Sequence, residues 1–248
     1  MGLIQDFFNG QKGIVGESKI ALKLGVLDFF GYKGKCLKNL YIPRYDGSTS
    51  EIDLLYITTK GLFVIESKNY KGYIFGDERA TNWTSTLYGG KTWYGGKNVE
   101  KYHFYNPIKQ NYSHIKTLAN YIGEIDAFSF IVFGDQAELK SISITSPGIY
   151  VCKAKDLNKI LREIWNREPD RYSENQVQEI YNRLLPLINA NRQVKIDHIQ
   201  NITANDNSNI CPWCGGNLVI RTARKGRNAG NSFYGCSNYP GCRYTRNI

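Results

Sequence analysis

The spacing of apolar residues divides the chain up to residue 188 into helical and extended segments. Apolar residues recur at helical spacing over 13–30, and Gly31 ends this pattern. Three runs rich in β-branched and aromatic residues follow, at 37–42, 52–58 and 62–67. Because short connections marked by proline and glycine separate these runs, they predict an antiparallel meander of strands.

The segment after the meander alternates between loop-rich and regular patterns. Residues 70–105 are rich in Gly, Tyr and Trp, which indicates hairpins and loops rather than helix. Pro107 then opens a helical pattern that runs to about Ile122. Two buried strands, 128–133 and 148–152, and two amphipathic helices, 154–165 and 174–188, complete the region. This mixture of strands and helices predicts an α/β domain with a mixed central sheet flanked by helices.

Length and composition leave room for one fair-sized domain and one small domain. The 248 residues are 42% hydrophobic and 22% charged, as in ordinary soluble globular proteins. No apolar run reaches the roughly 18 residues of a membrane span, and the N-terminus lacks the pattern of a signal peptide. We therefore expect a cytoplasmic protein with no membrane partner. The polar, asparagine-rich residues 189–209 indicate a linker between a domain at 1–188 and a small domain at 210–248.

Four of the six cysteines are clustered near the C-terminus, at Cys211, Cys214, Cys236 and Cys242. The first two form a Cys-x-x-Cys turn and the last two come from the far end of an expected hairpin, so four thiolates can enclose one metal ion. A closed site of this kind has no open position for substrate, which predicts one structural Zn²⁺ per chain. A redox Cys-x-x-Cys, the alternative, would not require the second pair. Cys36 and Cys152 stand apart and are expected to pack as small apolar side chains.

Basic residues are concentrated in the same C-terminal region. The net charge is +10, and six basic residues against one acid after residue 200 carry half of it. Such a compact basic segment indicates a polyanion partner, with a solvated basic face as the alternative. Cations that follow phosphates and rings that stack on bases suit single-strand binding, although the rings could instead pack the small core. The residues expected to contact nucleic acid are Arg221, Arg224, Lys225, Arg227, Phe233, Tyr234, Tyr239 and Arg243.

The C-terminal motifs resemble a known zinc module. Two stretches carry the resemblance, Cys211-Pro-Trp-Cys-Gly-Gly-Asn-Leu-Val-Ile-Arg and Phe233-Tyr-Gly-Cys-Ser-Asn-Tyr-Pro-Gly-Cys-Arg-Tyr. They are similar to the four-Cys zinc ribbon at the C-terminus of type IA DNA topoisomerases. The resemblance implies DNA binding with a preference for single strands. It does not imply topoisomerase activity, because the chain is too short to hold the body of that enzyme.

A second candidate site lies in the meander, where carboxylates and a lysine occupy neighbouring strands. Side chains on a strand alternate between faces, so Glu66 and Lys68 point the same way, and a tight turn would bring Asp53 beside them. Carboxylates can hold Mg²⁺ or Mn²⁺ for phosphodiester hydrolysis, while a lysine orients water or stabilises charge. Glu17 is placed to add a carboxylate, and Gln110 to hold a phosphate or the water. The alternative, a surface Glu-x-Lys ion pair, is disfavoured because apolar residues surround the set.

These residues resemble the nuclease-related domain, NERD, of the PD-(D/E)xK nuclease superfamily, over about residues 10–135. The resemblance is carried by Gly16-Glu17, Glu51-Ile52-Asp53, Val64-Ile65-Glu66-Ser67-Lys68 and Gln110-Asn111. It implies a restriction-endonuclease-like core, to which residues 153–188 add a helical extension. By this resemblance Asp53 and Glu66 are metal ligands, Lys68 is the catalytic lysine, Glu17 is an accessory acid and Gln110 is a supporting polar residue.

The motifs together predict a metal-dependent nuclease that hydrolyses DNA and is targeted by its ribbon to single-stranded or unwound regions. One alternative is a non-catalytic DNA-binding or DNA-processing accessory protein that only grips nucleic acid. Another is an RNA-processing enzyme, since nothing in the candidate active-site residues excludes RNA. His114 lies one helical turn after Gln110 and is expected to be a solvated or core-edge histidine, with a place in the same site as the alternative.

Overall fold

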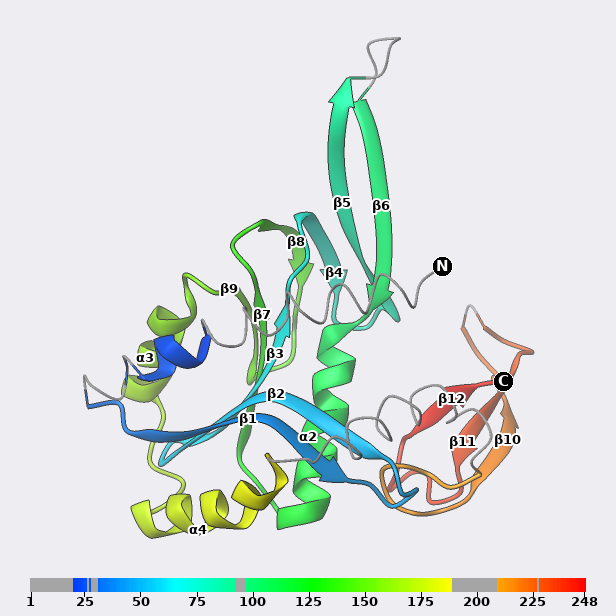
Figure 1. Ribbon diagram of the computed structural model, residues 1–248. Helices are drawn as coiled ribbons and strands as arrows, with labels where there is room; N and C mark the ends of the chain where they lie inside the picture. The colour runs from blue at the N-terminus through cyan, green and yellow to red at the C-terminus, as the bar shows by residue number, and fades with distance from the viewer. Residues whose placement is uncertain (1–19, 26, 28–30, 92–96, 189–208, 227) are drawn as a thin grey trace.

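The computed structural model describes residues 20–25, 27, 31–91, 97–188, 209–226 and 228–248, apart from the side chains of 88–91, 97 and 98 (Figure 1). Two sheets and their covering helices form the larger part, and a small third sheet follows near the C-terminus. The expected mixed α/β architecture is confirmed. Most of the helix expected at 13–30 lies outside the described residues, as does nearly all of the expected linker.

The central sheet has five strands in the order β1-β2-β3-β7-β9. Its strands are β1 (Gly34–Pro43), β2 (Thr49–Thr58), β3 (Gly61–Lys68), β7 (Ala127–Phe133) and β9 (Ile149–Lys153). The first three form the predicted antiparallel meander. The remaining pairs are parallel, so the chain crosses back over the sheet through helix α2 (Pro107–Ile122) before it enters β7.

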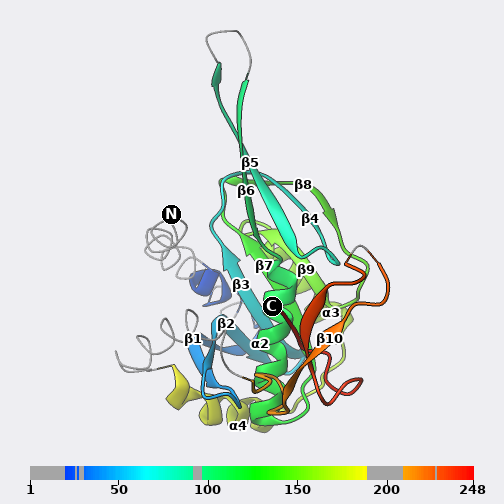
Figure 2. The same ribbon diagram turned by 90° about the vertical axis from the view of Figure 1, so that its right-hand side faces the viewer.

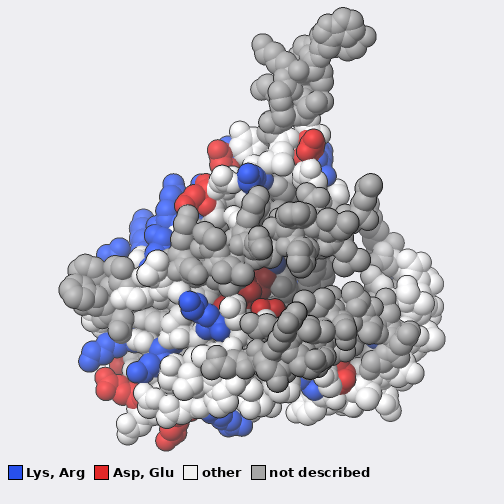
Figure 3. Space-filling model, viewed as in Figure 1, with Lys and Arg blue, Asp and Glu red and all other residues white. Residues whose placement is uncertain are grey.

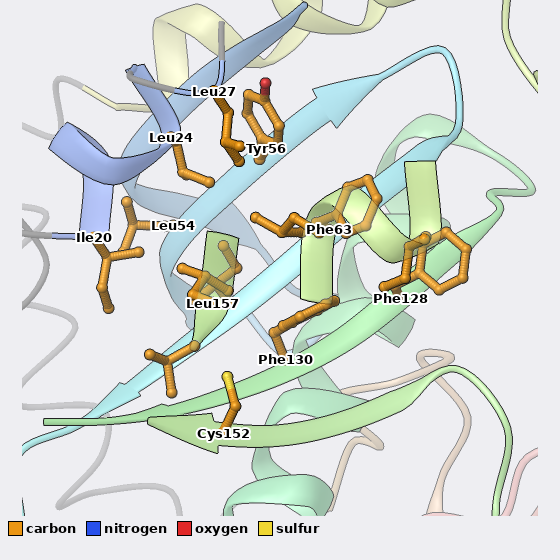
Figure 4. Close-up of a cluster of buried hydrophobic side chains, with 14 residues drawn as sticks. Ile20, Leu24, Leu27, Leu54, Tyr56, Phe63, Phe128, Phe130, Cys152 and Leu157 are labelled. Atoms are coloured by element: carbon orange, nitrogen blue, oxygen red, sulfur yellow. The ribbon is translucent and has the colours of Figure 1, made fainter. Parts of the chain in front are cut away.

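Both faces of this sheet are covered, which explains why β3 reads as a continuous apolar run. Phe63 and Ile65 point into a core shared with the helical segment 20–25 and with α3 (Leu157–Arg167), part of which is shown in Figure 4. Leu62 and Val64 point into a second core, against α2 and α4 (Glu174–Leu184). Glu66 and Lys68 therefore stand at the end of a strand that is buried on both faces.

The second sheet has the order β6-β5-β4-β8. Its strands are β4 (Gly72–Asp77), β5 (Asn82–Lys91), β6 (Lys97–Tyr105) and β8 (Ala137–Ser143), and the β5–β6 hairpin projects from the body of the molecule (Figures 1 and 2). Trp83 fills the junction with the central sheet, where its ring stacks on Phe133 at 6.2 Å between centroids. The hairpins expected in 70–105 are present, but the pattern did not predict β8, which alternates irregularly between exposed and half-buried residues.

Helix α2 is held at its start by Asn106, which fixes the direction of the whole helix. The side chain of Asn106 accepts a hydrogen bond from the backbone N–H of Ile108, as an N-cap does. Its amide donates to the carbonyls of Asp77, Glu78 and Ala80. None of the described helices has the length and apolar character needed to cross a bilayer.

The C-terminal ribbon is an antiparallel sheet of β10 (Leu218–Thr222), β11 (Ser232–Cys236) and β12 (Thr245–Asn247). Its small core consists of buried Leu218 and the cysteines, with Trp213, Tyr234 and Tyr244 packed against them. The ribbon lies beside α2 in both views of the molecule (Figures 1 and 2).

Candidate active site and zinc centre

The two carboxylates and the lysine expected to act together do meet, where β2 and β3 run side by side. Leu54 pairs with Ile65, so Asp53 and Glu66 come next along the two antiparallel strands. The ammonium of Lys68 donates to Glu66 Oε1 at 2.7 Å. Asp53 Oδ2 accepts a hydrogen bond from the backbone N–H of Ser67 at 2.8 Å. One backbone turn thus places all three charged groups at one spot.

Glu66 is ionised in this site despite its burial. The residue is only 3% exposed. Burial raises the pKa of its carboxyl, but Lys68 and His114 outweigh burial and bring the pKa down to about 2. Burial lowers the pKa of Lys68, while Glu66 and then Asp53 raise it by more, so that it stays above its usual value. The pair is therefore a buried carboxylate–ammonium pair in its charged form.

A second Glu-x-Lys on a strand shows what a surface pair of the same pattern looks like. On β8, Lys140 lies 3.1 Å from Glu138, and the side chains are 46% and 57% exposed. The side chains of Lys68 and Glu66 are 17% and 4% exposed. An identical motif is thus a solvated ion pair at one place and a buried charge pair at the other.

Helix α2 supplies the other polar groups of the site. Gln110 Oε1 accepts a hydrogen bond from Lys68 Nζ at 2.9 Å, so Gln110 holds the lysine in this structure. The neighbouring Asn111 is fully buried and donates to the carbonyl of Val64 at 2.8 Å and to Ser129 Oγ at 2.9 Å. These bonds hold the helix against β3 and β7, two residues before Glu66 on β3.

His114 belongs to the site, which was the less favoured of its two predicted placements, and it is not a solvated histidine. The residue is 6% exposed, its Nε2 lies 3.3 Å from Glu66 Oε2, and its Nδ1 lies 2.7 Å from Ser50 Oγ. Its position four residues after Gln110 put it on the same face of α2. That spacing was the available signal, but burial depends on how the helix packs on the sheet. Glu17 lies outside the described residues.

The donor set suits a hard divalent cation. Mg²⁺ and Mn²⁺ bind one or two carboxylates and take their remaining ligands from water or phosphate. Asp53 and Glu66 provide two carboxylates beside the polar face of α2 that carries Gln110 and His114. In the space-filling view, acidic side chains are visible in the centre of one face, where β2, β3 and α2 meet (Figure 3). Within the described residues, three or more metal-ligating side chains gather only at the four cysteines.

The four cysteines of the ribbon are arranged to hold one metal ion. Their Sγ atoms all lie within 4.8 Å of one another, with Cys211 and Cys242 3.7 Å apart and Cys214 and Cys236 3.3 Å apart. Tetrahedral zinc with Zn–S bonds of about 2.3 Å requires sulfur–sulfur separations of about 3.8 Å. The cysteines form no disulfides. The geometry is therefore consistent with a structural Zn²⁺, as the spacing predicted.

The ribbon is docked on helix α2 through Trp213, which stands inside the Cys-x-x-Cys turn. Trp213 Nε1 donates to Ser113 Oγ at 3.0 Å, and Asn120 donates from its amide to the carbonyl of Trp213. The indole also meets Tyr112 edge-on, at 5.5 Å between ring centroids. The sequence predicted a linker before the ribbon and did not predict a contact between the two domains, but in this structure the ribbon rests on the helix that carries Gln110 and His114.

Some of the residues expected to contact nucleic acid are exposed, and others make contacts within the ribbon. Arg224, Lys225, Tyr239 and Arg243 are exposed, Phe233 is half-buried, and Arg227 lies outside the described residues. Arg221 donates to the carbonyl of Cys236 at 3.0 Å and lies over the ring of Tyr239. Tyr234 packs on the zinc core, and Arg246, which the sequence did not single out, lies over its ring at 4.8 Å.

Comparisons with known proteins agree with this two-part organisation. Residues 12–134 match the family model of the nuclease-related domain, NERD. Residues 208–248 match the model of the topoisomerase DNA-binding C4 zinc finger. The chain therefore combines a region similar to the nuclease-related domain with a C-terminal region similar to the DNA-binding zinc finger of topoisomerases.

Its relatives include one chain of similar extent and DNA topoisomerases that match shorter stretches. An uncharacterized protein of Bacillus anthracis is 29% identical over 190 residues, 76% of this chain and 82% of the relative. DNA topoisomerase 1 of Archaeoglobus fulgidus is 33% identical over 120 residues, 48% of this chain but 16% of that enzyme. DNA topoisomerase 1 of Methanocaldococcus jannaschii is 41% identical over 50 residues, 20% of this chain and 6% of the enzyme. No solved structure matches the chain.

Proposed function

We propose that this protein is a metal-dependent nuclease that hydrolyses DNA phosphodiester bonds at the cluster of Asp53, Glu66, Lys68 and Gln110. The observation that carries the proposal is the burial of the Glu66–Lys68 pair. A buried ion pair is often no more stabilising than well-packed apolar side chains of similar volume, and clusters of perturbed charges are typical of functional sites. The exposed Glu138–Lys140 pair shows that the chain does not bury every pair of this pattern.

Each residue of the cluster has a separate part in the proposed reaction. Asp53 and Glu66 would hold Mg²⁺ or Mn²⁺, which as a Lewis acid polarises the phosphate and lowers the pKa of a bound water. Lys68 presents a positive charge next to the scissile phosphate and stabilises the charge that develops there. Gln110 keeps the ammonium of Lys68 in place by accepting one of its hydrogen bonds. Glu17, an expected accessory acid, remains a prediction.

The ribbon is proposed to bind the DNA on which this site acts. Arg224, Lys225 and Arg243 are exposed cations, and Tyr239 is an exposed ring that can stack on an unpaired base. This combination favours single-stranded or unwound DNA. Because the ribbon rests on α2, bound DNA is presented to the nuclease-like site at a fixed distance rather than by a flexible tether.

Cleavage assays with several substrates test this proposal. The protein is incubated with supercoiled, linear and single-stranded DNA and with RNA, in Mg²⁺ or Mn²⁺, beside Glu66→Ala, Lys68→Ala and the control Glu138→Ala. We expect DNA cleavage by the wild type and the control, and none by the two site variants, while all four bind DNA equally. A wild type that binds DNA but cleaves no substrate would instead support the non-catalytic accessory protein, and cleavage of RNA alone would support an RNA-processing enzyme.

A further inference from the structure

We infer that His114 is a positioning residue for Glu66, held in one ring tautomer by Ser50 and Arg44. The inference rests on the proposed nuclease function, since it assigns His114 to the alignment of a carboxylate that would bind the catalytic metal ion. The contacts that carry it join Arg44 after β1, Ser50 on β2 and His114 on α2, and Ser50 and His114 are 64 residues apart in the sequence.

The hydrogen-bonding capacity of Ser50 decides the arrangement. Arg44 Nη2 lies 3.1 Å from Ser50 Oγ and can only donate, so Ser50 accepts that bond. The same oxygen lies 2.7 Å from His114 Nδ1. Ser50 is 1% exposed, so its hydroxyl proton has no access to water. Among the contacts of Ser50 Oγ in the described residues, only His114 Nδ1 can accept this proton, so the hydroxyl donates to Nδ1. A nitrogen that accepts carries no proton, so the ring proton of His114 resides on Nε2.

The protonated Nε2 faces Glu66. Nε2 lies 3.3 Å from Glu66 Oε2, within ion-pair distance, and this buried nitrogen makes no hydrogen bond within the described part of the chain. The opposite tautomer would direct a nitrogen lone pair at a buried carboxylate, which is unfavourable without water to separate them. The Arg44–Ser50–His114 chain therefore places the protonated Nε2 3.3 Å from the second oxygen of Glu66.

Glu66 is consequently fixed from two sides. Lys68 holds Oε1 from β3 itself, and His114 approaches Oε2 from α2. Two contacts from different elements define both the position and the plane of the carboxylate, whereas Lys68 alone would leave it free to rotate about one bond. A carboxylate that orients a metal ion needs this support, and losing such a partner typically reduces activity or metal affinity about tenfold to 100-fold.

Kinetics of matched histidine variants test the role of His114. His103 is the control, because it is exposed and makes a comparable contact, Nδ1 to Thr84 Oγ1 at 3.1 Å. In the zinc-loaded full chain with Mn²⁺, we expect His114→Leu to lower kcat by about tenfold to 100-fold and to leave the KM for DNA within about twofold. His114→Gln, whose amide can replace Nε2–H, should recover most of kcat, and His103→Gln should match the wild type. An unchanged kcat in His114→Leu overturns the inference, as does an equal loss in His114→Gln.

Nuclear magnetic resonance of the ring nitrogens decides the same question without any cleavage. The chain has three histidines, so the His114 signals are those that disappear in His114→Gln. We expect a proton on Nε2 that exchanges slowly with water, and faster exchange of that proton in Ser50→Ala and in Glu66→Gln. A proton on Nδ1 with a bare Nε2 overturns the inference. If the wild type cleaves nothing, the proposed function fails, while this ring-proton signal still shows whether His114 holds Glu66.

Discussion

Replacing Glu66 by Gln should destabilise the folded protein far more than the same replacement at Glu138. Both glutamates lie on a strand two residues before a lysine and contact that lysine, at 2.7 Å for Glu66 and 3.1 Å for Glu138. They differ in burial, because Glu66 is enclosed between β3 and α2 and Glu138 is exposed on β8. The comparison therefore isolates the effect of burying a charge pair.

The magnitude follows from the pKa of Glu66. Burial raises this pKa, but Lys68 and His114 lower it from 4.5 to about 2. One pKa unit is worth about 1.4 kcal/mol, so the ionised carboxylate contributes on the order of 3 kcal/mol to the free energy of unfolding. Exposed ion pairs contribute about 0–1 kcal/mol. We expect Glu66→Gln to cost on the order of 3 kcal/mol at neutral pH and Glu138→Gln to cost less than about 1 kcal/mol.

The pH dependence has a definite sign. Since the pKa of Glu66 is lower in the folded than in the unfolded chain, its contribution is complete above pH 4.5 and is lost as pH falls toward about 2. Urea unfolding of zinc-loaded wild type, Glu66→Gln and Glu138→Gln should therefore show a gap between the first two that narrows below pH 4.5. Equal losses in the two variants, or a gap that does not change with pH, would refute the reasoning.

Three further predictions concern the zinc, the docking of the ribbon and helix α2. Removing zinc with a chelator should abolish amide protection in 210–248 and leave that of β2 and β3 intact, because the cysteine core cannot form without metal; joint loss of both would contradict this. Trp213→Ala should let the ribbon tumble independently of α2 in ¹⁵N relaxation measurements, since it removes the hydrogen bond to Ser113 and the indole packing; unchanged relaxation would contradict the docking. Asn111→Ala should cost about 2–3 kcal/mol in urea unfolding, because buried partners lose their donor, whereas exposed Asn182→Ala should cost less than about 0.5 kcal/mol.

The meander and the zinc cysteines could be predicted because their signals are local. Strand β3 reads as an unbroken apolar run since both of its faces are covered, and its two-residue period put Glu66 and Lys68 on one side. The pairing of β2 with β3 needed only a tight turn between them. The zinc site could be predicted from the spacing of the four cysteines alone.

The remaining features depend on contacts between distant segments. His114 is buried because α2 packs against β2 and β3, and no pattern within the helix separates a buried from a solvated histidine. Trp213 and Ser113 are 100 residues apart, so the docking of the ribbon had no local signal. Strand β8 was missed because its half-exposed residues lack a regular alternation. Arg221 and Tyr234 were assigned to DNA by residue type, and the fold gives each of them a partner within the ribbon.

The most direct test of catalysis at Asp53 and Glu66 is the rate of DNA cleavage as a function of Mn²⁺ concentration. The zinc-loaded wild type, Asp53→Asn and the control Glu138→Gln are compared on the same DNA, with DNA binding measured in parallel. The account predicts that the rate of the wild type and the control rises and saturates with Mn²⁺, and that Asp53→Asn binds DNA normally but requires far more Mn²⁺ or does not cleave. A rate that is independent of Mn²⁺, or an Asp53→Asn variant with an unchanged Mn²⁺ dependence, would contradict it.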